Sequence, residues 1–419
     1  MNATAVSRRT ATAVITGLGV VAPNGVGIED YWAATLRGES GIRRLERFDP
    51  AGYPATLAGE VPDGMFDPAA HLPSRLLPQT DRMTRLALVA ADRALADAGV
   101  EPDRMADYDM GVVTASSSGG YEFGQRELQN LWGKGPEHVS AYQSFAWFYA
   151  VNTGQISIRH GMRGPGRVVV AEQAGGLDAL GQARRTIRNG TPLMVSGAVD
   201  SALCPWGWIA YLSTGRISTC EDPAAAYLPF AAEAAGHVPG EGGAILVVED
   251  AERAGARPGS RCYAAVAGYA ATFDPAPGSG RPPALRAAAE LALSDAGLEP
   301  GDVDVVFADA DGSPERDRAE AAALTGLFGE RGVPVCAPKA LTGRLSSGGA
   351  PLDVAAAVLS IRDGVLPPAG PVERAAKEYG IDLVTGGPRA QKVRTALVLA
   401  RGEGGFNSAV VLRGAPDGC

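Results

Sequence analysis

The chain contains very little histidine, and this limits the chemistry open to it. Its 419 residues include four histidines. They are His71, His138, His160 and His237. None of them has the sequence spacing of ligands to one metal ion, so the sequence predicts no metal site and assigns them structural or exposed positions. A mechanism that needs two histidines has to find both among these four.

Cysteine is also scarce and poorly spaced for pairing. The five cysteines are Cys204, Cys220, Cys262, Cys336 and Cys419. Their number is odd, they are far apart, and no two form a CxxC pair, which argues against a disulfide framework and against a zinc site. This pattern favours a reducing cytoplasm as the location of the protein.

Long hydrophobic runs are missing as well. No stretch reaches the roughly 20 apolar residues that cross a bilayer. The residues Ser7-Arg8-Arg9-Thr10 superficially resemble a twin-arginine export signal, but the apolar run Val14–Val21 behind them is short, glycine-broken and β-branched. That run predicts a first core strand, and we expect a soluble protein.

The charge balance excludes two classes of partner. The net charge is −9, from 38 basic and 47 acidic residues, and the basic residues are scattered. Neither nucleic acid nor an anionic membrane surface is therefore expected to bind. Hydrophobic residues make up 46% and charged residues 20%, as in an average globular protein, which disfavours long disorder and coiled coils.

A repeat divides the chain into two related halves. The segment Ala94–Pro102 recurs as Ala292–Pro300, 198 residues later. Each copy ends an Ala- and Leu-rich helix at a glycine, in the place where a left-handed residue closes a helix, and each is followed by an apolar strand. Runs such as Val168–Ala171 and Ala244–Val248 predict strands in sheets that are covered on both faces. We expect an α/β protein divided into residues 1–250 and 251–419, with the boundary in Ala251–Ser260.

One turn has the form of a nucleophile turn. The strand Val168–Val170 continues into Ala171–Leu180, which contains two glycines and opens a helix. A sharp turn before a helix N-terminus presents its apex residue to backbone N–H groups and to the positive end of the helix dipole. The apex residue is Gln173.

The surrounding sequence resembles the β-ketoacyl synthases of the thiolase-like superfamily, in which the residue at this apex is an acyl-accepting cysteine. The matching segments, in chain order, are Val14–Val20, Gln79–Arg82, Gly161–Pro165, Pro229–Gly242 and Gly404–Asn407. The resemblance covers nearly the whole chain. It implies a thiolase fold, a duplicated five-layered α/β/α/β/α body, without a cofactor.

Three departures from the family pattern bear on function. Gln173 replaces the cysteine, and an amide forms no thioester. The two catalytic histidines that the family places after an alanine and after a glycine are replaced by Asp311 and Arg344, while Lys339 and Glu320 remain. The resemblance therefore argues against a working condensing enzyme. We expect a filled, salt-bridged former active site, with Arg344 paired to Asp311 or Glu320.

This pattern is similar to one subgroup, the chain length factors or ketosynthase β subunits of type II aromatic polyketide synthases. The segments Ala171–Gly176 and Ser144–Gln155 carry this likeness. It implies a non-condensing subunit that pairs with a ketosynthase α subunit and shapes a polyketide tunnel at their interface. An acyl carrier protein, usually acidic, is expected to dock mainly on the α subunit because this chain is acidic too.

The resemblance also places a tunnel-lining helix after the glycine pair at 119–120. Tyr121, Gly124 and Leu128 share one face of such a helix. Gly124 and Leu128 are smaller than an aromatic ring, which predicts a decaketide or longer product; the alternative is that all three are ordinary core residues.

Further interpretations stay open from the sequence. Trp147, Phe148 and Tyr149 form an aromatic cluster that fits either the subunit interface or ordinary burial. Gln173 either bonds to N–H groups of its turn and closes the old pocket, or positions a malonyl thioester so that the chain acts as a malonyl-carrier-protein decarboxylase. Cys336 is the best substitute nucleophile, but no histidine accompanies it, and an inert buried thiol is expected.

Overall fold

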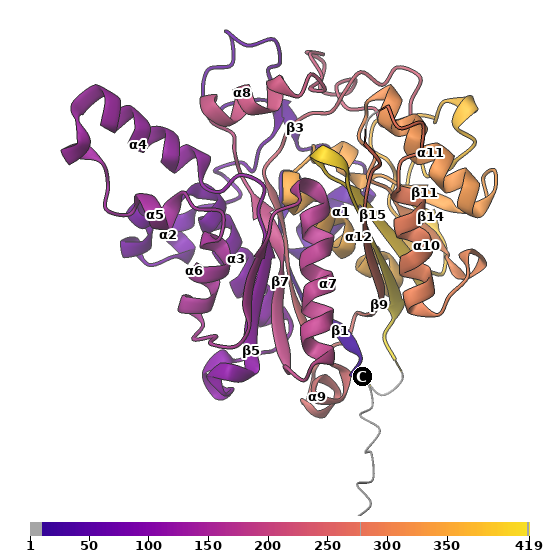
Figure 1. The fold of residues 1–419 in the computed structure, drawn as a ribbon, viewed down its shortest axis with the longest axis horizontal. Helices are drawn as coiled ribbons and strands as arrows, with labels where there is room; N and C mark the ends of the chain where they lie inside the picture. The colour runs from indigo at the N-terminus through magenta and orange to yellow at the C-terminus, as the bar shows by residue number, and fades with distance from the viewer. Residues whose placement is uncertain (1–10, 277, 417–418) are drawn as a thin grey trace, which may run out of the picture.

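The computed structural model describes residues 11–276, 278–416 and 419 (Figure 1). The twin-arginine segment of residues 7–10 lies outside this part of the chain. Within the described residues, no helix combines the length and apolar character needed to cross a membrane.

The first half of the chain contains eight strands and nine helices among the described residues. In chain order these are β1 Ala13–Ala22, β2 Gly25–Val26, α1 Ile28–Leu36, β3 Ile42–Arg44, β4 Leu57–Gly59, α2 Pro68–His71, α3 Arg82–Asp97, β5 Met110–Ala115, α4 Tyr121–Lys134, α5 Gln143–Ala146, α6 Val151–Arg159, β6 Gly166–Val169, α7 Gly175–Arg188, β7 Leu193–Asp200, α8 Pro205–Ser213, β8 Gly242–Asp250 and α9 Ala251–Ala256.

The second half repeats this arrangement. Its elements are β9 Ala264–Phe273, α10 Leu285–Ala296, β10 Val305–Phe307, α11 Pro314–Phe328, β11 Pro334–Cys336, α12 Gly349–Asp363, β12 Val365–Leu366, β13 Asp382–Leu383, β14 Arg389–Ala390, β15 Thr395–Arg401 and β16 Phe406–Gly414. The strand order is β6-β5-β7-β8-β1 in the first half and β11-β10-β15-β16-β9 in the second. In each half, the two strand pairs nearest the centre of this order are antiparallel, and the two pairs towards its outer end are parallel. The predicted duplication is therefore confirmed in the topology.

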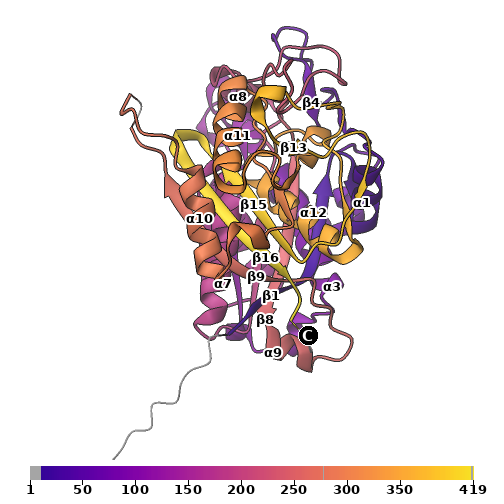
Figure 2. The ribbon, with the colours of Figure 1, turned by 90° about the vertical axis from the view of Figure 1, so that its right-hand side faces the viewer.

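The elements stack as five layers, as the fold class predicts. Helices α3 and α6 cover the outer face of the first sheet, and α10 and α11 cover the second (Figure 1). Helices α7 and α12 contact strands of both halves and each other, so they form the middle layer. Figure 2 looks onto the second half, with α10 and α11 in front of β15 and β16.

The glycines of the repeat adopt the conformation that the sequence predicts. Gly99 follows α3 with a φ of 62°, and Gly297 follows α10 with a φ of 66°. Both lie in the left-handed region, which glycine enters without the steric cost of a Cβ atom. The two copies of the repeat thus end equivalent outer helices.

Strand β6 departs from the prediction of a strand covered on both faces. It is an edge strand, paired only with β5 among the described residues, and its residues are exposed or half-buried. The equivalent strand β11 is covered on its outer side by β13. An apolar sequence alone does not distinguish a central strand from an edge strand whose outer side is free. The prediction of a strand covered on both faces holds for β8, in which every residue except the last, Asp250, is buried.

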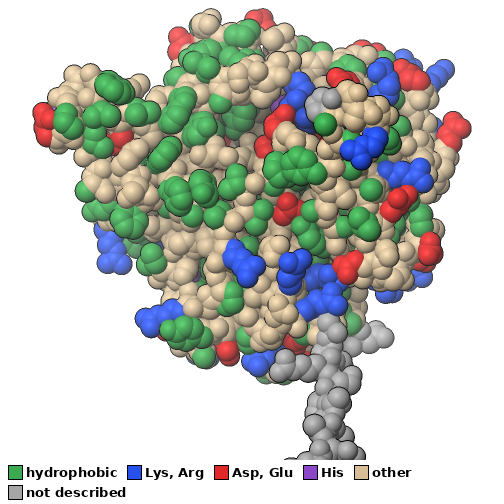
Figure 3. Space-filling view, viewed as in Figure 1, with side chains coloured by type: hydrophobic (Ala, Val, Ile, Leu, Met, Phe, Trp, Pro, Cys, Tyr) green, Lys and Arg blue, Asp and Glu red, His purple; other side chains and the backbone are tan. Residues whose placement is uncertain are grey.

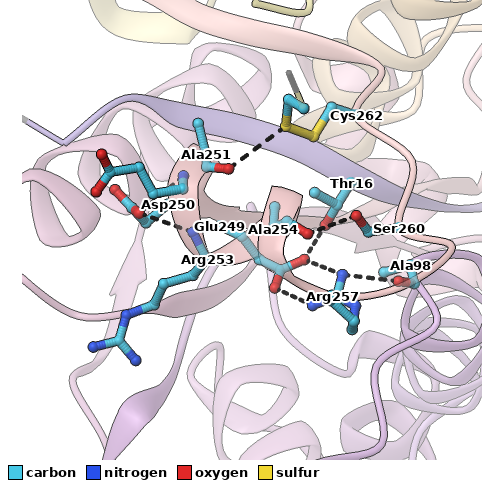
Figure 4. The surroundings of a disulfide bond; sticks show 12 residues. Thr16, Ala98, Glu249, Asp250, Ala251, Arg253, Ala254, Arg257, Ser260 and Cys262 are labelled. Atoms are coloured by element: carbon cyan, nitrogen blue, oxygen red, sulfur yellow. Dashed lines mark hydrogen bonds and ion pairs between the residues drawn. A yellow bond between two sulfur atoms is a disulfide. The ribbon is translucent and has the colours of Figure 1, made fainter. Parts of the chain in front are cut away.

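The cysteine pattern also needs correction, because Cys262 and Cys419 form a disulfide (Figure 4). Their Cα atoms are 5.7 Å apart although 157 residues separate them in sequence. The bond lies beside Ala251 at the start of α9. Spacing along the chain argued against pairing, but the fold brings the segment before β9 next to Cys419. Cys204, Cys220 and Cys336 are free thiols.

Candidate functional site

The former nucleophile turn lies between β6 and α7, where the sequence places it. Residues Glu172–Ala174 form a single 3₁₀ turn, and Gln173 is fully buried. Glu172 has a φ of 48°, which is uncommon for a residue with a side chain. A Cβ atom at Gly176 would lie 2.3 Å from the ring of Pro351, so glycine is required where α7 meets α12. The turn is therefore held tightly against the second half.

Gln173 bonds to a carboxylate rather than to the N–H groups of its own turn. Its Nε2 donates to Oδ1 of Asp309 at 2.9 Å. The prediction that Gln173 bonds to turn N–H groups is therefore wrong about the partner. Asp309 comes from the loop after β10, so this bond joins the two halves of the chain.

Arg344 fills the place of the second missing histidine and binds the same carboxylate. Its guanidinium donates to both carboxylate oxygens of Asp309 at 3.2 Å, and to the carbonyl of Arg401 at 2.7 Å. It also lies 3.8 Å from Asp311. The predicted pairing of Arg344 with Asp311 is thus confirmed, at longer range. The predicted pairing with Glu320 is wrong, because the main partner of Arg344 is Asp309.

Asp309 is the residue that the sequence analysis missed. It is fully buried and also accepts from the backbone N–H of Arg401 at 2.8 Å. Burial alone would raise the pKa of Asp309, but Arg344 and Lys339 outweigh it and hold this pKa below its ordinary value. Its place two residues before Asp311 was the available signal, because both follow one buried strand.

Asp311 fills the place of the first missing histidine and lies among basic groups. Ser313 Oγ donates to it at 2.5 Å, and Arg316 and Arg216 lie 3.5 and 3.8 Å away. Burial opposes its charge, but Arg344 and the other nearby cations hold its pKa well below the usual range. His237, at 3.9 Å, is buried, and burial lowers its pKa to about 3. His237 is therefore neutral at pH 7 and adds no positive charge to this cluster.

Lys339 and Glu320, the retained family residues, form hydrogen bonds with the backbone of the same loop. Lys339 Nζ donates to the carbonyl of Ala308 at 2.5 Å and lies 2.6 Å from a carboxylate oxygen of Asp353. Glu320 accepts the N–H groups of Asp309 and Ala310 at 2.7 and 2.8 Å. Burial raises the pKa of Glu320 to about 8. These groups fix the loop that carries Asp309.

A small cavity of about 140 Å³ remains beside this network. Its wall includes Tyr121, Arg216, His237, Arg344 and Glu403, but Gln173 is not part of it. Arg216 forms an ion pair with Glu403 at its rim. The cavity contains no thiol, and Cys336 is fully buried with its pKa raised by burial, as expected of an inert thiol. Among the described residues, the cavity wall therefore offers no cysteine for acyl transfer.

The predicted tunnel residues lie on α4, which begins at Tyr121 as expected. Tyr121 stacks on Trp206 of α8, with ring centroids 4.6 Å apart. A Cβ atom at Gly124 would lie 2.5 Å from Cδ1 of Trp147 and 3.2 Å from Cζ3 of Trp206. Gly124 therefore makes room for two tryptophan rings. Leu128, by contrast, is 38% exposed.

Large apolar side chains gather on the surface around α4 and α5. Trp147, Phe148 and Tyr149 are between 42% and 46% exposed, and Trp132 at the end of α4 is 82% exposed. With Leu128, Tyr142 and Phe145 they form what we call the aromatic patch. Figure 3 shows hydrophobic side chains concentrated over this part of the molecule. Isolated apolar residues are normal on a surface, but a contiguous group of this kind marks an interaction site.

Comparison with known proteins agrees with this description. The N-terminal domain of β-ketoacyl synthases matches residues 11–254, and the C-terminal domain matches residues 263–373. The actinorhodin polyketide putative β-ketoacyl synthase 2 of Streptomyces coelicolor is 63% identical over 96% of this chain and 98% of its own. The tetracenomycin polyketide synthase ketoacyl synthase β subunit of Streptomyces glaucescens is 60% identical over 96% of this chain and 98% of its own. The ishigamide ketosynthase/chain length factor superposes with a TM-score of 0.88 at 27% identity, covering 97% of this chain and all of that one.

Proposed function

The chain belongs to the β-ketoacyl synthase family, and from this we propose that it is a non-condensing chain length factor, the ketosynthase β subunit of a type II aromatic polyketide synthase. It pairs with a ketosynthase α subunit and shapes the tunnel into which the poly-β-ketone grows. We place the boundary between its halves at residues 250 and 251, where β8 ends and α9 begins.

One observation carries this proposal: the fold of a condensing enzyme is kept around a site that lacks the family's cysteine and both of its histidines. Gln173, Asp311 and Arg344 stand where condensation needs a cysteine and two histidines. Gln173 Nε2 and the Arg344 guanidinium both donate to the buried carboxylate of Asp309. A subunit with this site helps to form the walls of the tunnel and does not catalyse the condensation.

The partner surface is supported by two neighbouring features. The outer edge of β6 has no strand partner among the described residues, and the aromatic patch lies on the same side of the first half. Unpaired strand edges and exposed aromatic clusters are both covered in stable complexes. We therefore place the α subunit over β6, α4 and α5, in contact with Trp147, Phe148 and Tyr149. The carrier protein docks mainly on the α subunit, because the net charge here is −9.

The same face supports a long product. With the α subunit in place, Leu128 becomes part of an enclosed wall, and its side chain is smaller than a phenyl ring. The space beside Gly124 is filled by Trp147 and Trp206, so the proposed length rests on Leu128. We propose a product of decaketide length or longer, because chain and wall cannot occupy the same space.

The test is co-expression with the cognate α subunit, followed by mass spectrometry of the polyketide. We expect a heterodimer and decaketide or longer products. A stable homodimer that ignores the α subunit would contradict the pairing, and octaketides or shorter products would contradict the assigned length.

The alternative function is decarboxylation of a malonyl carrier protein through Gln173. It requires the Gln173 amide to touch the substrate, yet this side chain is fully buried and is not part of the cavity wall. We therefore expect the complex with Gln173→Ala to form acetyl carrier protein at the unchanged rate. Loss of acetyl formation in that variant would favour the decarboxylase.

A further inference from the structure

The loop that leads into α4 is held at both ends by buried carboxylates from other elements. This loop runs from Ser116, after β5, to Gly120, before Tyr121. Asp200, the last residue of β7, holds its beginning, and Asp81, which caps α3, holds the first turn of α4. Asp200 is 1% exposed and Asp81 is 2% exposed. A buried carboxylate persists only where it is well satisfied by donors.

Asp200 joins the loop to the former active site. Its Oδ1 accepts from Ser116 Oγ and its Oδ2 from the N–H of Ser117, each at 3.0 Å. The same Oδ2 accepts the N–H of Ser347 at 3.1 Å and the hydroxyl of Ser347. Ser347 follows Arg344 by three residues. A single carboxylate thus fixes the start of the α4 loop relative to the network that replaced the catalytic groups.

Asp81 divides its two oxygens between two helices. Its Oδ1 accepts the N–H of Met83 at 2.9 Å, an ordinary N-cap bond of α3. Its Oδ2 accepts the N–H of Phe123 at 2.8 Å, one of the first N–H groups of α4 that have no partner inside the helix. A Cβ atom at Gly120 would lie 2.8 Å from Cβ of Asp81 and 2.0 Å from the carbonyl oxygen of Ala146, so the approach is close.

An N-cap for α3 alone would need one oxygen, and a serine or threonine would supply it. The second oxygen of Asp81 is committed to α4. Between the two carboxylates there is no other buried charged anchor on residues 116–123 in the described structure. An ion pair between Arg47 and Glu122 at 3.1 Å and the bond from the Gly120 N–H to the carbonyl of Trp147 at 3.0 Å also hold this segment, so Asp81 and Asp200 are its buried anchors beside these contacts.

We propose that Asp81 and Asp200 are positioning residues for the length-determining helix. This inference rests on the proposed function: together the two carboxylates fix α4 against the core, and so fix how far its wall extends into the tunnel. They act through α4 and do not touch the polyketide. Losing either anchor lets the first turn of α4 move, so the tunnel no longer has a single depth.

The experiment compares Asp81→Ser with a matched cap variant, Asp250→Ser. Serine keeps an N-cap oxygen for Met83 and offers no second oxygen to Phe123. Asp250 caps α9 through the N–H groups of two residues of that helix and is remote from α4 in the fold. We expect both variants to form the heterodimer. Asp81→Ser should add products that differ from the wild-type length by at least one two-carbon unit, whereas Asp250→Ser keeps the wild-type length.

Hydrogen exchange supplies a readout that does not depend on synthesis. Loss of the Asp81 bond should raise exchange in the first turn of α4 by about tenfold, the effect of one hydrogen bond of about 1.4 kcal/mol. Ser116→Ala, which removes one donor to Asp200 and leaves both carboxyl groups in place, is the second variant if Asp81→Ser does not fold. It should also raise exchange there and broaden the product lengths.

The outcomes separate the two proposals. If the wild-type complex makes no polyketide, the proposed function fails, and the exchange data still decide whether the carboxylates anchor α4. If folded Asp81→Ser and Ser116→Ala exchange like wild type and give the single wild-type length, the positioning role is overturned.

Discussion

Arg344→Met tests whether the former active site now serves stability. The substitution removes a fully charged group that donates to both oxygens of Asp309, to the backbone carbonyl of Asp309 and to the carbonyl of Arg401. Asp309 then keeps Gln173 Nε2 and one backbone N–H as its nearest donors, and it stays fully buried. Breaking a buried ion pair by removing one partner costs about 3–5 kcal/mol, because the remaining charge is uncompensated.

This cost converts into a measurable shift of the melting temperature. At an unfolding entropy of about 2.1 cal/mol/K per residue, 419 residues give about 0.9 kcal/mol/K. A loss of about 3–5 kcal/mol therefore lowers the melting temperature by about 3–6 °C. Differential scanning calorimetry of the purified heterodimer measures it, with the scan rate held constant.

Two further variants make the result interpretable. Arg389→Met removes a half-buried arginine that lies 2.6 Å from Asp382, and an ion pair close to the surface contributes about 1 kcal/mol or less. We expect it to shift the melting temperature by about 1 °C. Arg344→Met combined with Asp309→Asn removes the stranded charge and should recover at least half of the loss. The reasoning is refuted if Arg344→Met lowers the melting temperature no more than Arg389→Met does. It is also refuted if the double variant is less stable than Arg344→Met alone.

Four other substitutions give independent checks. Leu128→Phe should shorten the polyketide by one or more two-carbon units, measured by mass; an unchanged length would remove Leu128 from the tunnel wall. Gln173→Cys, assayed without the α subunit, should restore no condensation, because both histidines stay absent. Any β-ketoacyl product in that assay would contradict this prediction. His237 is neutral in the fold with a pKa lowered to about 3 by burial, so its contribution is present above pH 6.5 and is lost progressively as pH falls towards 3. Wild type should therefore lose about 2 kcal/mol more than His237→Gln between pH 7 and pH 5, measured by chemical denaturation. Cys262→Ser should cost about 2–5 kcal/mol under non-reducing conditions. Reductant should destabilise wild type to the same level and leave that variant unchanged.

Much of the architecture was predictable from local sequence. The run Val14–Val21 became β1, the repeated helices end at left-handed glycines, and α4 begins at Tyr121. These features depend on the period of apolar residues and on backbone preferences, which act over a few residues. The positions of Gln173, Asp311 and Arg344 were predictable for another reason, because ordered motifs locate them within a known family pattern.

What sequence reasoning missed depends on contacts between distant segments. Asp309 lies 136 residues from Gln173 and 35 from Arg344. Its place two residues before Asp311 pointed to the same loop, but no local pattern shows which remote groups its carboxylate meets. The disulfide of Cys262 and Cys419 escaped for the same reason. Gly124 was read as a source of open space, whereas the tryptophans that occupy the space come from α8 and from the segment after α5. Propensity and periodicity carry no information about which remote side chain arrives at a given place.

Gln173 and Arg344 stand where the family pattern has a cysteine and a histidine, and both bond to Asp309. Gln173 belongs to the first half of the chain, while Asp309 and Arg344 belong to the second, and their bonds cross the middle layer. The Gln173 amide nitrogen and the Arg344 guanidinium both donate to the Asp309 carboxylate, and through Ser347 and Asp200 this network connects to the loop that starts α4. Gln173 and Arg344 thereby become part of the support for the helix that we assign to length control.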